Sequence, residues 1–313
     1  MPRRGNLMCR VLAYLGEPVL VNDLLYGADA SLVRQAVDPE LMSLLNLGGF
    51  GLAAWSPDSP SPGRPFTYRV STIPNFDRNL RALAQKVEAT AFVAHVRGVT
   101  YDERQQVGGH NVHPFQFEGV SVALAQNGDL SDFGRMRFDL LQYVRPELAS
   151  MIEGTTDTEW VYALILSMLD DPFGPVGPEE AAGAVERALE CLRDVREARG
   201  IAVQSPVNLV LTDGRWLVAT RFAFDYGWYP EDESFFAGER EHDYTSLWIT
   251  SEREGEDRDD RGAAEGRRSA VLVASEPLSK SHAGWFEVPE YSLIVATPDP
   301  ESGIAVEVRE LPW

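Results

Sequence analysis

The chain of 313 residues carries 48 acidic and 28 basic side chains, which give a formal net charge of −20 at pH 7. This excess of negative charge opposes nonspecific binding to nucleic acid or to an anionic membrane surface, so we expect neither as a partner. Hydrophobic residues make up 44% of the chain and charged residues 24%, a balance typical of globular proteins, and no apolar run approaches the ~18 residues of a membrane span.

The two cysteines of the chain are Cys9 and Cys191. Cys191 lies in a stretch with helical character, so a disulfide framework is not expected. We therefore expect a cytoplasmic location. The length fits one large domain or two modest ones.

The first informative stretch is 8–16, in which a Met-Cys step is followed by aliphatic and β-branched residues that predict a strand. If Met8 is removed, Cys9 begins the chain with a free α-amine. An α-amine has a reference pKa of about 7.7–8.0, so it can accept the thiol proton and later return it. Cys9 would then supply both nucleophile and base. The alternative is a buried strand cysteine without a catalytic role.

Seven residues precede Met8. Either Met8 is the true initiator and 1–7 is an over-long start, or 1–8 is removed as a propeptide. We favour the first explanation, because 1–7 lacks the length and the apolar core of a targeting signal.

Three glycines occur within four residues at Gly48, Gly49 and Gly51, and a strand-like run follows them. A tight turn that feeds a strand is favoured over a phosphate-binding loop, because the GxGxxG and GxxxxGK patterns are missing. Next along the chain we expect a strand at 66–72, a helix at 77–89 with Asp77 as N-cap, and a buried strand at 90–96.

Arg97 lies at the end of the strand expected at 90–96. Its guanidinium could bind a substrate carboxylate through two parallel hydrogen bonds, or it could belong to a structural ion pair. In the loop 108–115, His110 and His113 are three residues apart. No Cys or Glu of ligand spacing accompanies them, so a metal site is not expected.

Asn127 and Gly128 end a strand expected at 120–125. Asn-Gly is a strong hairpin-turn signal, yet the Asn127 amide and the Gly128 N–H can also form an oxyanion hole. Asp157 precedes a strongly apolar helix at 160–169. It could cap this helix, point into a site, or do both.

Five motifs occur together in this order: Met-Cys at 8–9, His-x-Arg-x-x-Thr at 95–100, Asn-x-His-Pro at 111–114, Asn-Gly at 127–128 and Thr-Asp-Thr-Glu at 156–159. Each match is weak by itself, but their joint occurrence resembles the class II glutamine amidotransferases of the N-terminal nucleophile hydrolase superfamily. The resemblance implies an α+β fold, a four-layer αββα sandwich in which two stacked antiparallel sheets are covered by helices on both outer faces. We expect no metal and no cofactor.

The resemblance also implies the catalytic residues. Cys9 attacks the γ-carboxamide carbon, with its own amine as general base and then general acid. Asn127 and Gly128 hold the tetrahedral oxyanion.

The substrate-binding residues follow from the same resemblance. Arg97 binds the α-carboxylate of a γ-glutamyl group, Asp157 binds its α-ammonium, and Thr100 adds a hydrogen bond. Gly49, within the turn 48–51, and His113 shape the pocket. A site with both charges would reject substrates that lack either group, because its own polar atoms would remain unpaired.

Two positions depart from the family pattern. Gln126 and Tyr101 stand where other members commonly carry histidine. Neither position is required by the mechanism above, so the departures concern the substrate more than the reaction.

The second half of the chain resembles the small stand-alone members, such as the γ-glutamyl amidohydrolases of ergothioneine synthesis and of glutathione breakdown. We expect a helix at 178–199 with a stop at Gly200, strands at 207–212 and 216–220 around an Asp213-Gly214 turn, a strand pair at 247–250 and 270–274, and a last strand at 291–296. The charge-rich segment 251–268 is expected to be a solvated loop insertion.

We expect a single domain at 9–313. The favoured function is hydrolysis of a γ-glutamyl amide or of glutamine through a γ-glutamyl thioester on Cys9. One alternative is a glutaminase subunit that passes ammonia to a separate synthetase partner, since no acceptor segment is attached. The other is an inactive γ-glutamyl-binding module in which the extra N-terminal residues remain.

Overall fold

The computed structural model describes residues 9–41, 45–98, 108–225, 246–253 and 268–313. Its strands are β1 (Arg10–Leu20), β2 (Phe50–Trp55), β3 (Phe66–Val70), β4 (Glu88–Val96), β5 (Ala123–Gly128), β6 (Ser205–Thr212), β7 (Leu217–Arg221), β8 (Ala223–Phe224), β9 (Trp248–Arg253), β10 (Arg268–Ala274), β11 (Trp285–Glu287), β12 (Ser292–Asp299) and β13 (Gly303–Glu310). Its α-helices are α1 (Leu32–Gln35), α2 (Arg78–Ala84), α3 (Phe133–Met136), α4 (Pro146–Ala149), α5 (Asp157–Ser167) and α6 (Pro178–Ala198). Short 3-10 turns lie at Pro74–Phe76, Gly109–Asn111 and Asp139–Gln142, and a π-helical turn lies at Asp23–Gly27.

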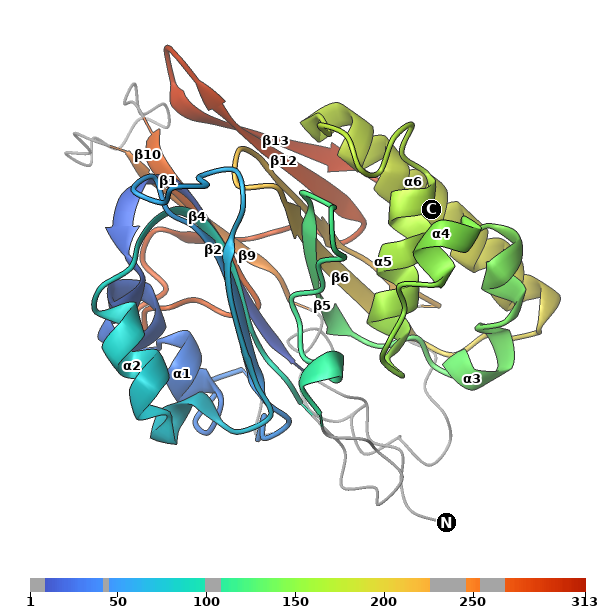
Figure 1. Cartoon of the computed structure of the whole chain (residues 1–313), viewed down its shortest axis with the longest axis horizontal. Coiled ribbons are helices and arrows are strands. Elements are labelled where there is room, and N and C mark those ends of the chain that lie inside the picture. The colour runs from blue at the N-terminus through green and yellow to red at the C-terminus, as the bar shows by residue number, and fades with distance from the viewer. Residues whose placement is uncertain (1–8, 42–44, 99–107, 226–245, 254–267) are drawn as a thin grey trace.

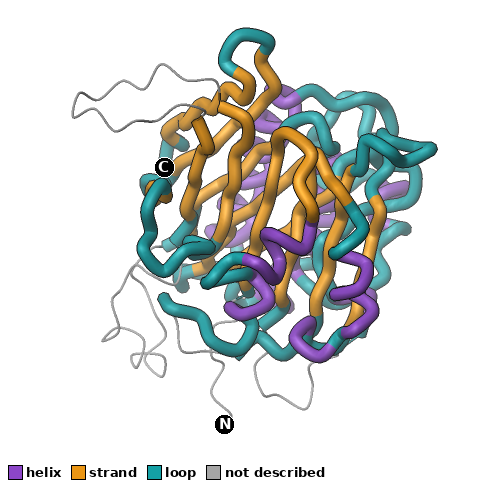
Figure 2. The backbone as a smooth tube through the Cα atoms, turned by 90° about the vertical axis from the view of Figure 1, so that its left-hand side faces the viewer, coloured by secondary structure: helices purple, strands orange, loops and turns teal. Residues whose placement is uncertain are grey.

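The strands form one curled sheet that has two halves. Figure 2 shows the strands running side by side. One half has the order β3-β2-β4-β1-β10, and β9 joins it through β10. The other half has the order β13-β12-β7-β6-β5. The halves meet where β10 and β13 pair in parallel at Arg268 and Gly303, whereas the neighbouring pairs within each half are antiparallel.

Side chains on both faces of each half are buried, because successive residues of a strand point to opposite faces. In β1, Leu12 and Tyr14 belong to a core cluster that also contains residues of α1 and α2. Val11 and Ala13 point the other way and share a second cluster with Val210 of β6, in the other half of the sheet. The chain therefore has an α+β fold, with α1 and α2 on one side of the strands and α3 to α6 on the other (Figure 1).

A third core cluster lies between the second half of the sheet and its helices. The middle of α5 is apolar on all sides, and every side chain of 161–166 is at most 1% exposed. The longer α6 buries one face instead, through residues spaced three and four apart such as Val185, Leu189 and Leu192. Gly200 follows α6 with a φ of 60°, which confirms the expected stop signal.

Several local predictions are confirmed. The Asp77 carboxylate accepts hydrogen bonds from the backbone N–H groups of Asn79 and Leu80 and so caps α2. The turn at 213–214 joins the antiparallel strands β6 and β7. Cys9 and Cys191 are both free thiols.

Three expectations about the strands need correction. The strand expected at 120–125 begins at Ala123 and continues through Gly128, so Asn127-Gly128 lies inside a ladder with β6 and is not a hairpin turn. The strand at 291–296 is not the last, because β13 follows and pairs with it. The segment 251–268 is not a loop throughout, because β9 continues to Arg253 and β10 begins at Arg268. Residues 254–267 lie outside the described part.

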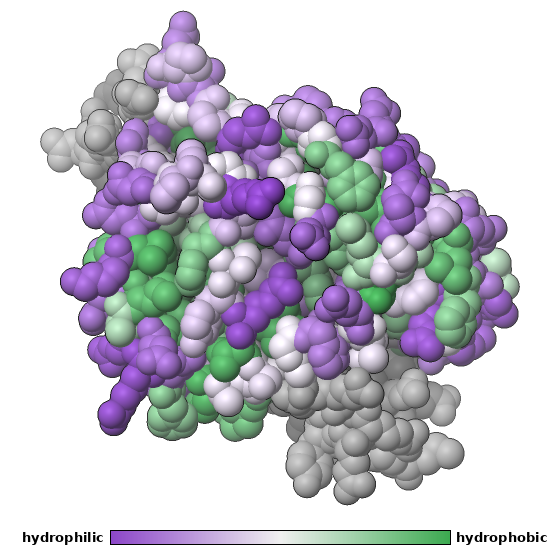
Figure 3. Space-filling view, viewed as in Figure 1, coloured by the Kyte–Doolittle hydropathy of each residue, from purple (hydrophilic) through white to green (hydrophobic). Residues whose placement is uncertain are grey.

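The face shown in Figure 3 is mostly hydrophilic and carries apolar residues in small patches. Among the described residues, no helix combines the length and the apolar character needed to cross a bilayer.

Candidate active site

Cys9 lies immediately before β1 and is 5% exposed. Its Sγ accepts a hydrogen bond from the Gly98 backbone N–H, with 3.4 Å between the heavy atoms. Burial raises the pKa of the Cys9 thiol to about 11, although the Gly98 hydrogen bond and the Arg97 charge lower it, while the charges of Asp157 and Asp129 raise it. Cys9 is therefore a neutral thiol at pH 7, and it needs a base before it can act as a nucleophile.

Arg97 lies near Cys9 because of the strand register. β1 and β4 are antiparallel with Arg10 opposite Val96, so the residue after β4 meets the residue before β1. Burial lowers the pKa of Arg97, but the charges of Cys9 and Asp157 raise it. Arg97 is 7% exposed and offers a planar set of N–H groups suited to a carboxylate.

The glycine turn at 48–51 supports the Arg97 backbone. The Gly49 carbonyl accepts a hydrogen bond from the Arg97 N–H, and the Gly48 N–H donates to the Arg97 carbonyl, each at 2.8 Å. Gly49 has a φ of 126°, and a Cβ there would lie 2.6 Å from the Val70 carbonyl oxygen. The position therefore requires glycine. A direct role of Gly49 in shaping the substrate pocket stays a prediction.

Asn127 lies in β5 opposite Asn208 and is 3% exposed. Its Nδ2 donates a hydrogen bond to Ser275 Oγ at 2.9 Å. Gly128 follows with a φ of 123°, and a Cβ there would overlap the Pro206 carbonyl oxygen. The close approach of the strands β5 and β6 explains why glycine follows Asn127. From the sequence alone, a hairpin turn would explain the same Asn-Gly pair.

Asp157 is the first residue of α5. Its Oδ2 accepts a hydrogen bond from the Leu130 N–H at 2.6 Å, and its Oδ1 accepts one from the Thr158 N–H at 2.8 Å. Burial raises the pKa of Asp157, while these hydrogen bonds lower it. The carboxylate thus anchors the helix start to the segment that follows Asn127 and Gly128, and it also acts electrostatically on Cys9.

His113 is buried against His95, with ring centroids 4.1 Å apart, and its Nδ1 accepts a hydrogen bond from the Gln126 N–H at 3.4 Å. Burial lowers the pKa of His113 well below its usual value and that of His95 to about 3. Both rings are therefore neutral at pH 7, and His113 supports the backbone directly before Asn127. Within the described ranges, no cluster of His, Cys, Asp and Glu side chains could hold a metal ion.

Three parts of the sequence-based prediction lie outside the described residues. These are the segment 1–8, Thr100 and Tyr101. The hydrogen bond expected from Thr100 stays a prediction.

Comparison with known proteins supplies the family. The sequence model described as glutamine amidotransferases class-II matches residues 49–301. The chain belongs to this family. The probable glutamine amidotransferase DUG3 of Saccharomyces cerevisiae is 30% identical over 304 residues, which cover 92% of this chain and 81% of that protein.

Solved structures of class II amidotransferases share the fold. A glutamine aminotransferase class-II domain protein from Silicibacter pomeroyi gives a TM-score of 0.59 at 22% identity, over 97% of this chain and 100% of that chain. The glutamine phosphoribosylpyrophosphate amidotransferase of B. subtilis gives 0.55 at 16% identity, over 96% of this chain and 49% of that chain.

Sequence reasoning missed two buried residues of this amidotransferase that hold the start of β1. Ser275 contacts Val11 and Asn127. Glu276 pairs with Arg10, with 3.6 Å between Oε2 and Nε, and Arg10 Nη1 donates to the Cys9 carbonyl at 3.1 Å. The Ser-Glu-Pro step at 275–277 was visible in the sequence, but only the pairing of β10 with β1 reveals its partners.

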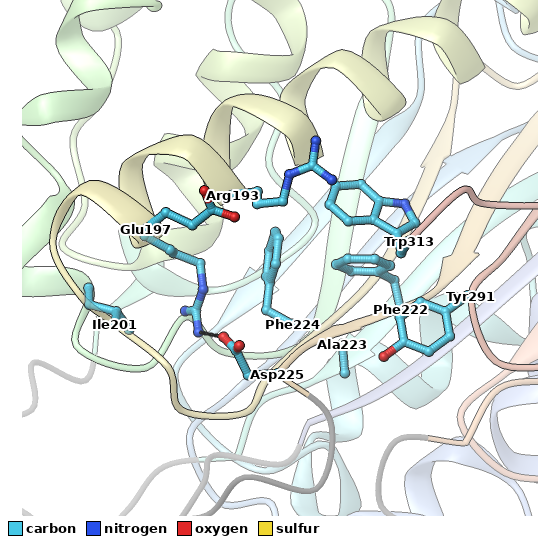
Figure 4. Close-up of a pocket in the computed structure, with 10 residues that line it drawn as sticks. Arg193, Glu197, Ile201, Phe222, Ala223, Phe224, Asp225, Tyr291 and Trp313 are labelled. Carbon is cyan, nitrogen blue, oxygen red and sulfur yellow. Dashed lines mark hydrogen bonds and ion pairs between the residues drawn. The ribbon is translucent and has the colours of Figure 1, made fainter.

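A pocket of about 230 Å³ lies at the C-terminal end of α6, and Cys9 is not among its lining residues. Figure 4 shows the rings of Phe222, Phe224 and Trp313 along its wall. Arg196 also lines the pocket and forms an ion pair with Asp225 at 2.8 Å. Arg196 also donates to Ser205 Oγ and to the Val203 carbonyl. No predicted catalytic or substrate-binding residue lines this pocket, and its buried guanidinium is already paired, so we do not assign it to the amidotransferase reaction.

Proposed function

We propose that this class II amidotransferase hydrolyses a γ-glutamyl amide bond with Cys9 as the nucleophile. The Cys9 sulfur attacks the γ-carboxamide carbon, and collapse of the tetrahedral intermediate expels the amine with a proton and leaves a γ-glutamyl thioester. Water then attacks the thioester carbonyl, which releases glutamate and restores the thiol. Asn127 and Gly128 donate hydrogen bonds to the oxyanion of each tetrahedral intermediate.

The observation that carries the proposal is the convergence of opposite charges on the buried Cys9 thiol. The Arg97 cation and the Asp157 carboxylate both act on the pKa of this sulfur. The α-carboxylate and α-ammonium of a γ-glutamyl group carry the complementary charges, so the two side chains suit its two ends. This supports the assignment of Arg97 to the carboxylate and of Asp157 to the ammonium.

The proposal includes one domain at 9–313 with four layers, αββα. Three core clusters support the layering: one between α1, α2 and the first half of the sheet, one shared by both halves, and one between the second half and its helices. It also includes a mature chain that begins at Cys9, because the pKa of the thiol is raised and an α-amine on Cys9 would supply the base.

The test is covalent trapping. A glutamine analogue with an electrophilic carbon in place of the γ-amide is expected to label Cys9, and intact-protein mass spectrometry followed by peptide mapping locates the adduct. Cys191 in α6 provides an internal control, because neither Arg97 nor Asp157 acts on its thiol. Labelling of Cys191 in place of Cys9, or equal labelling of a Cys9→Ala variant, would refute the nucleophile. A panel of γ-glutamyl amides would then identify the leaving group.

Recognition of the head group gives a separate prediction. Arg97→Lys and Asp157→Asn are each expected to lower kcat/KM for a γ-glutamyl amide by about ten- to a hundredfold. Lysine cannot form the two parallel hydrogen bonds of a guanidinium, and asparagine has no negative charge to pair with the α-ammonium. The measurement compares each variant on the full substrate and on an analogue without the α-amine. The amine-free analogue should be equally poor for wild type and Asp157→Asn, but poorer still for Arg97→Lys. If Asp157→Asn lowered kcat/KM for the amine-free analogue as much as it does for the full substrate, the assignment of Asp157 to the ammonium would be contradicted.

A further inference from the structure

Ser275 connects the strand that follows Cys9 to the strand that carries Asn127. It lies directly after β10 and is 3% exposed. Its Oγ accepts hydrogen bonds from the Val11 N–H at 3.0 Å and from Asn127 Nδ2 at 2.9 Å. Its own N–H donates to the Val11 carbonyl at 3.0 Å. Ser275 therefore links the two halves of the sheet at the end where Cys9 lies.

The number of hydrogen bonds that Ser275 and Asn127 can form indicates the role of this contact. A side-chain amide has two N–H donors, and a serine hydroxyl oxygen has two lone pairs. Val11 and Asn127 occupy both lone pairs of Ser275 Oγ. One N–H of Asn127 is thus held by Ser275, while the second can point elsewhere.

We infer that Ser275 is a positioning residue that orients the Asn127 amide for oxyanion binding. This inference rests on the proposed function, because it assigns a purpose to the second N–H of Asn127. Oxyanion stabilisation needs donors about 2.7–3.1 Å from the developing negative charge, and the terminal torsion of asparagine is otherwise broad. The same hydroxyl also accepts the hydrogen bond from Val11, two residues after Cys9. It therefore also fixes the position of β1, and so of Cys9, relative to the Asn127 amide.

The test is the effect of Ser275→Ala on the steady-state constants of the mature enzyme. We expect kcat to fall about ten- to a hundredfold with KM within about threefold, because ground-state binding by Arg97 and Asp157 remains while the transition-state donor is misplaced. Alkylation of Cys9 by a small neutral reagent passes through no oxyanion and should proceed at the wild-type rate. Ser275→Thr keeps the hydroxyl and is expected to retain more of the wild-type kcat than Ser275→Ala.

Thr220→Val is the matched control. The buried Thr220 hydroxyl accepts a hydrogen bond from the Leu209 backbone N–H at 3.0 Å. The Ser275 hydroxyl accepts the same kind of hydrogen bond from Val11. Both substitutions leave one backbone N–H unpaired, so both should lower the melting temperature, but Thr220→Val should leave kcat unchanged.

A double-mutant cycle decides whether Ser275 acts through Asn127. If it does, Ser275→Ala combined with Asn127→Ala has the kcat of Asn127→Ala alone. The inference would be overturned if the kcat loss of the double variant were the product of the two single losses, or if kcat of Ser275→Ala were within twofold of wild type. Neither result would affect the proposed reaction. Full activity of Cys9→Ala would instead overturn the proposed reaction.

Discussion

A chain that begins at Cys9 is expected to turn over γ-glutamyl amides ~10²–10⁴-fold faster than a chain that keeps residues 1–8, the usual contribution of a general base. In the longer chain the Cys9 nitrogen is an amide and cannot accept a proton. Because burial raises the pKa of the Cys9 thiol to about 11, the thiol is overwhelmingly protonated near neutral pH. A liberated α-amine supplies the missing base on the same residue.

The comparison requires chains of defined start. The short form is translated from Met8 and loses it, and the long form carries Met8→Leu to prevent internal initiation. Intact mass confirms both before kcat/KM is measured. The matched control inserts one glycine between Met8 and Cys9 of the short form, which keeps the thiol but moves the amine away.

The pH dependence provides a second measurement on the same chains. The amine must be unprotonated to act as a base, so kcat/KM of the short form should rise with pH through the amine pKa, about 7.7–8.0 in the reference state. It should fall as pH drops below that range. A mass-verified long form that matches the short form in rate would exclude the amine as the base.

Local signals in the sequence predicted much of the fold. The Asp77 cap, the Gly200 stop and the turn at 213–214 each depend on residues within a few positions of one another, and each is confirmed. The family motifs added the arrangement of Cys9 and Arg97, which the register of β1 and β4 brings together.

The features that were missed depend on contacts between distant segments. Ser275 receives its hydrogen bond from Val11 across a separation of 264 residues, so no local pattern marks it. The Asn-Gly step is ambiguous for the same reason, since the close approach of the distant Pro206 carbonyl leaves no room for a Cβ at Gly128. β13 alternates at Ile304, Val306 and Val308, but Val308 is exposed and the strand ends in the charged stretch 307–310, which weakens its strand signal.

Asn127→Ala is expected to reduce kcat by ~10²–10³-fold, equivalent to ~2.7–4 kcal/mol of lost transition-state stabilisation, the range measured for removal of one oxyanion-hole donor. KM should change little, because the amide donates to charge that exists only in the tetrahedral intermediate. Asn127→Asp keeps the shape but places a negative group against the oxyanion, so its loss should be at least as large.

A binding measurement separates this role from a loss of folding. A γ-aldehyde analogue of glutamate would form a tetrahedral adduct with Cys9, and its affinity should fall with kcat in Asn127→Ala, whereas the affinity for glutamate itself should remain. Asn208 is the matched control, because it lies opposite Asn127 and accepts a hydrogen bond from the Phe222 N–H at 2.9 Å. Asn208→Ala should lower the melting temperature but preserve aldehyde affinity. Equal aldehyde affinity in Asn127→Ala and wild type would remove Asn127 from the oxyanion hole, since a donor that contacts the tetrahedral oxygen cannot be deleted without weakening the adduct.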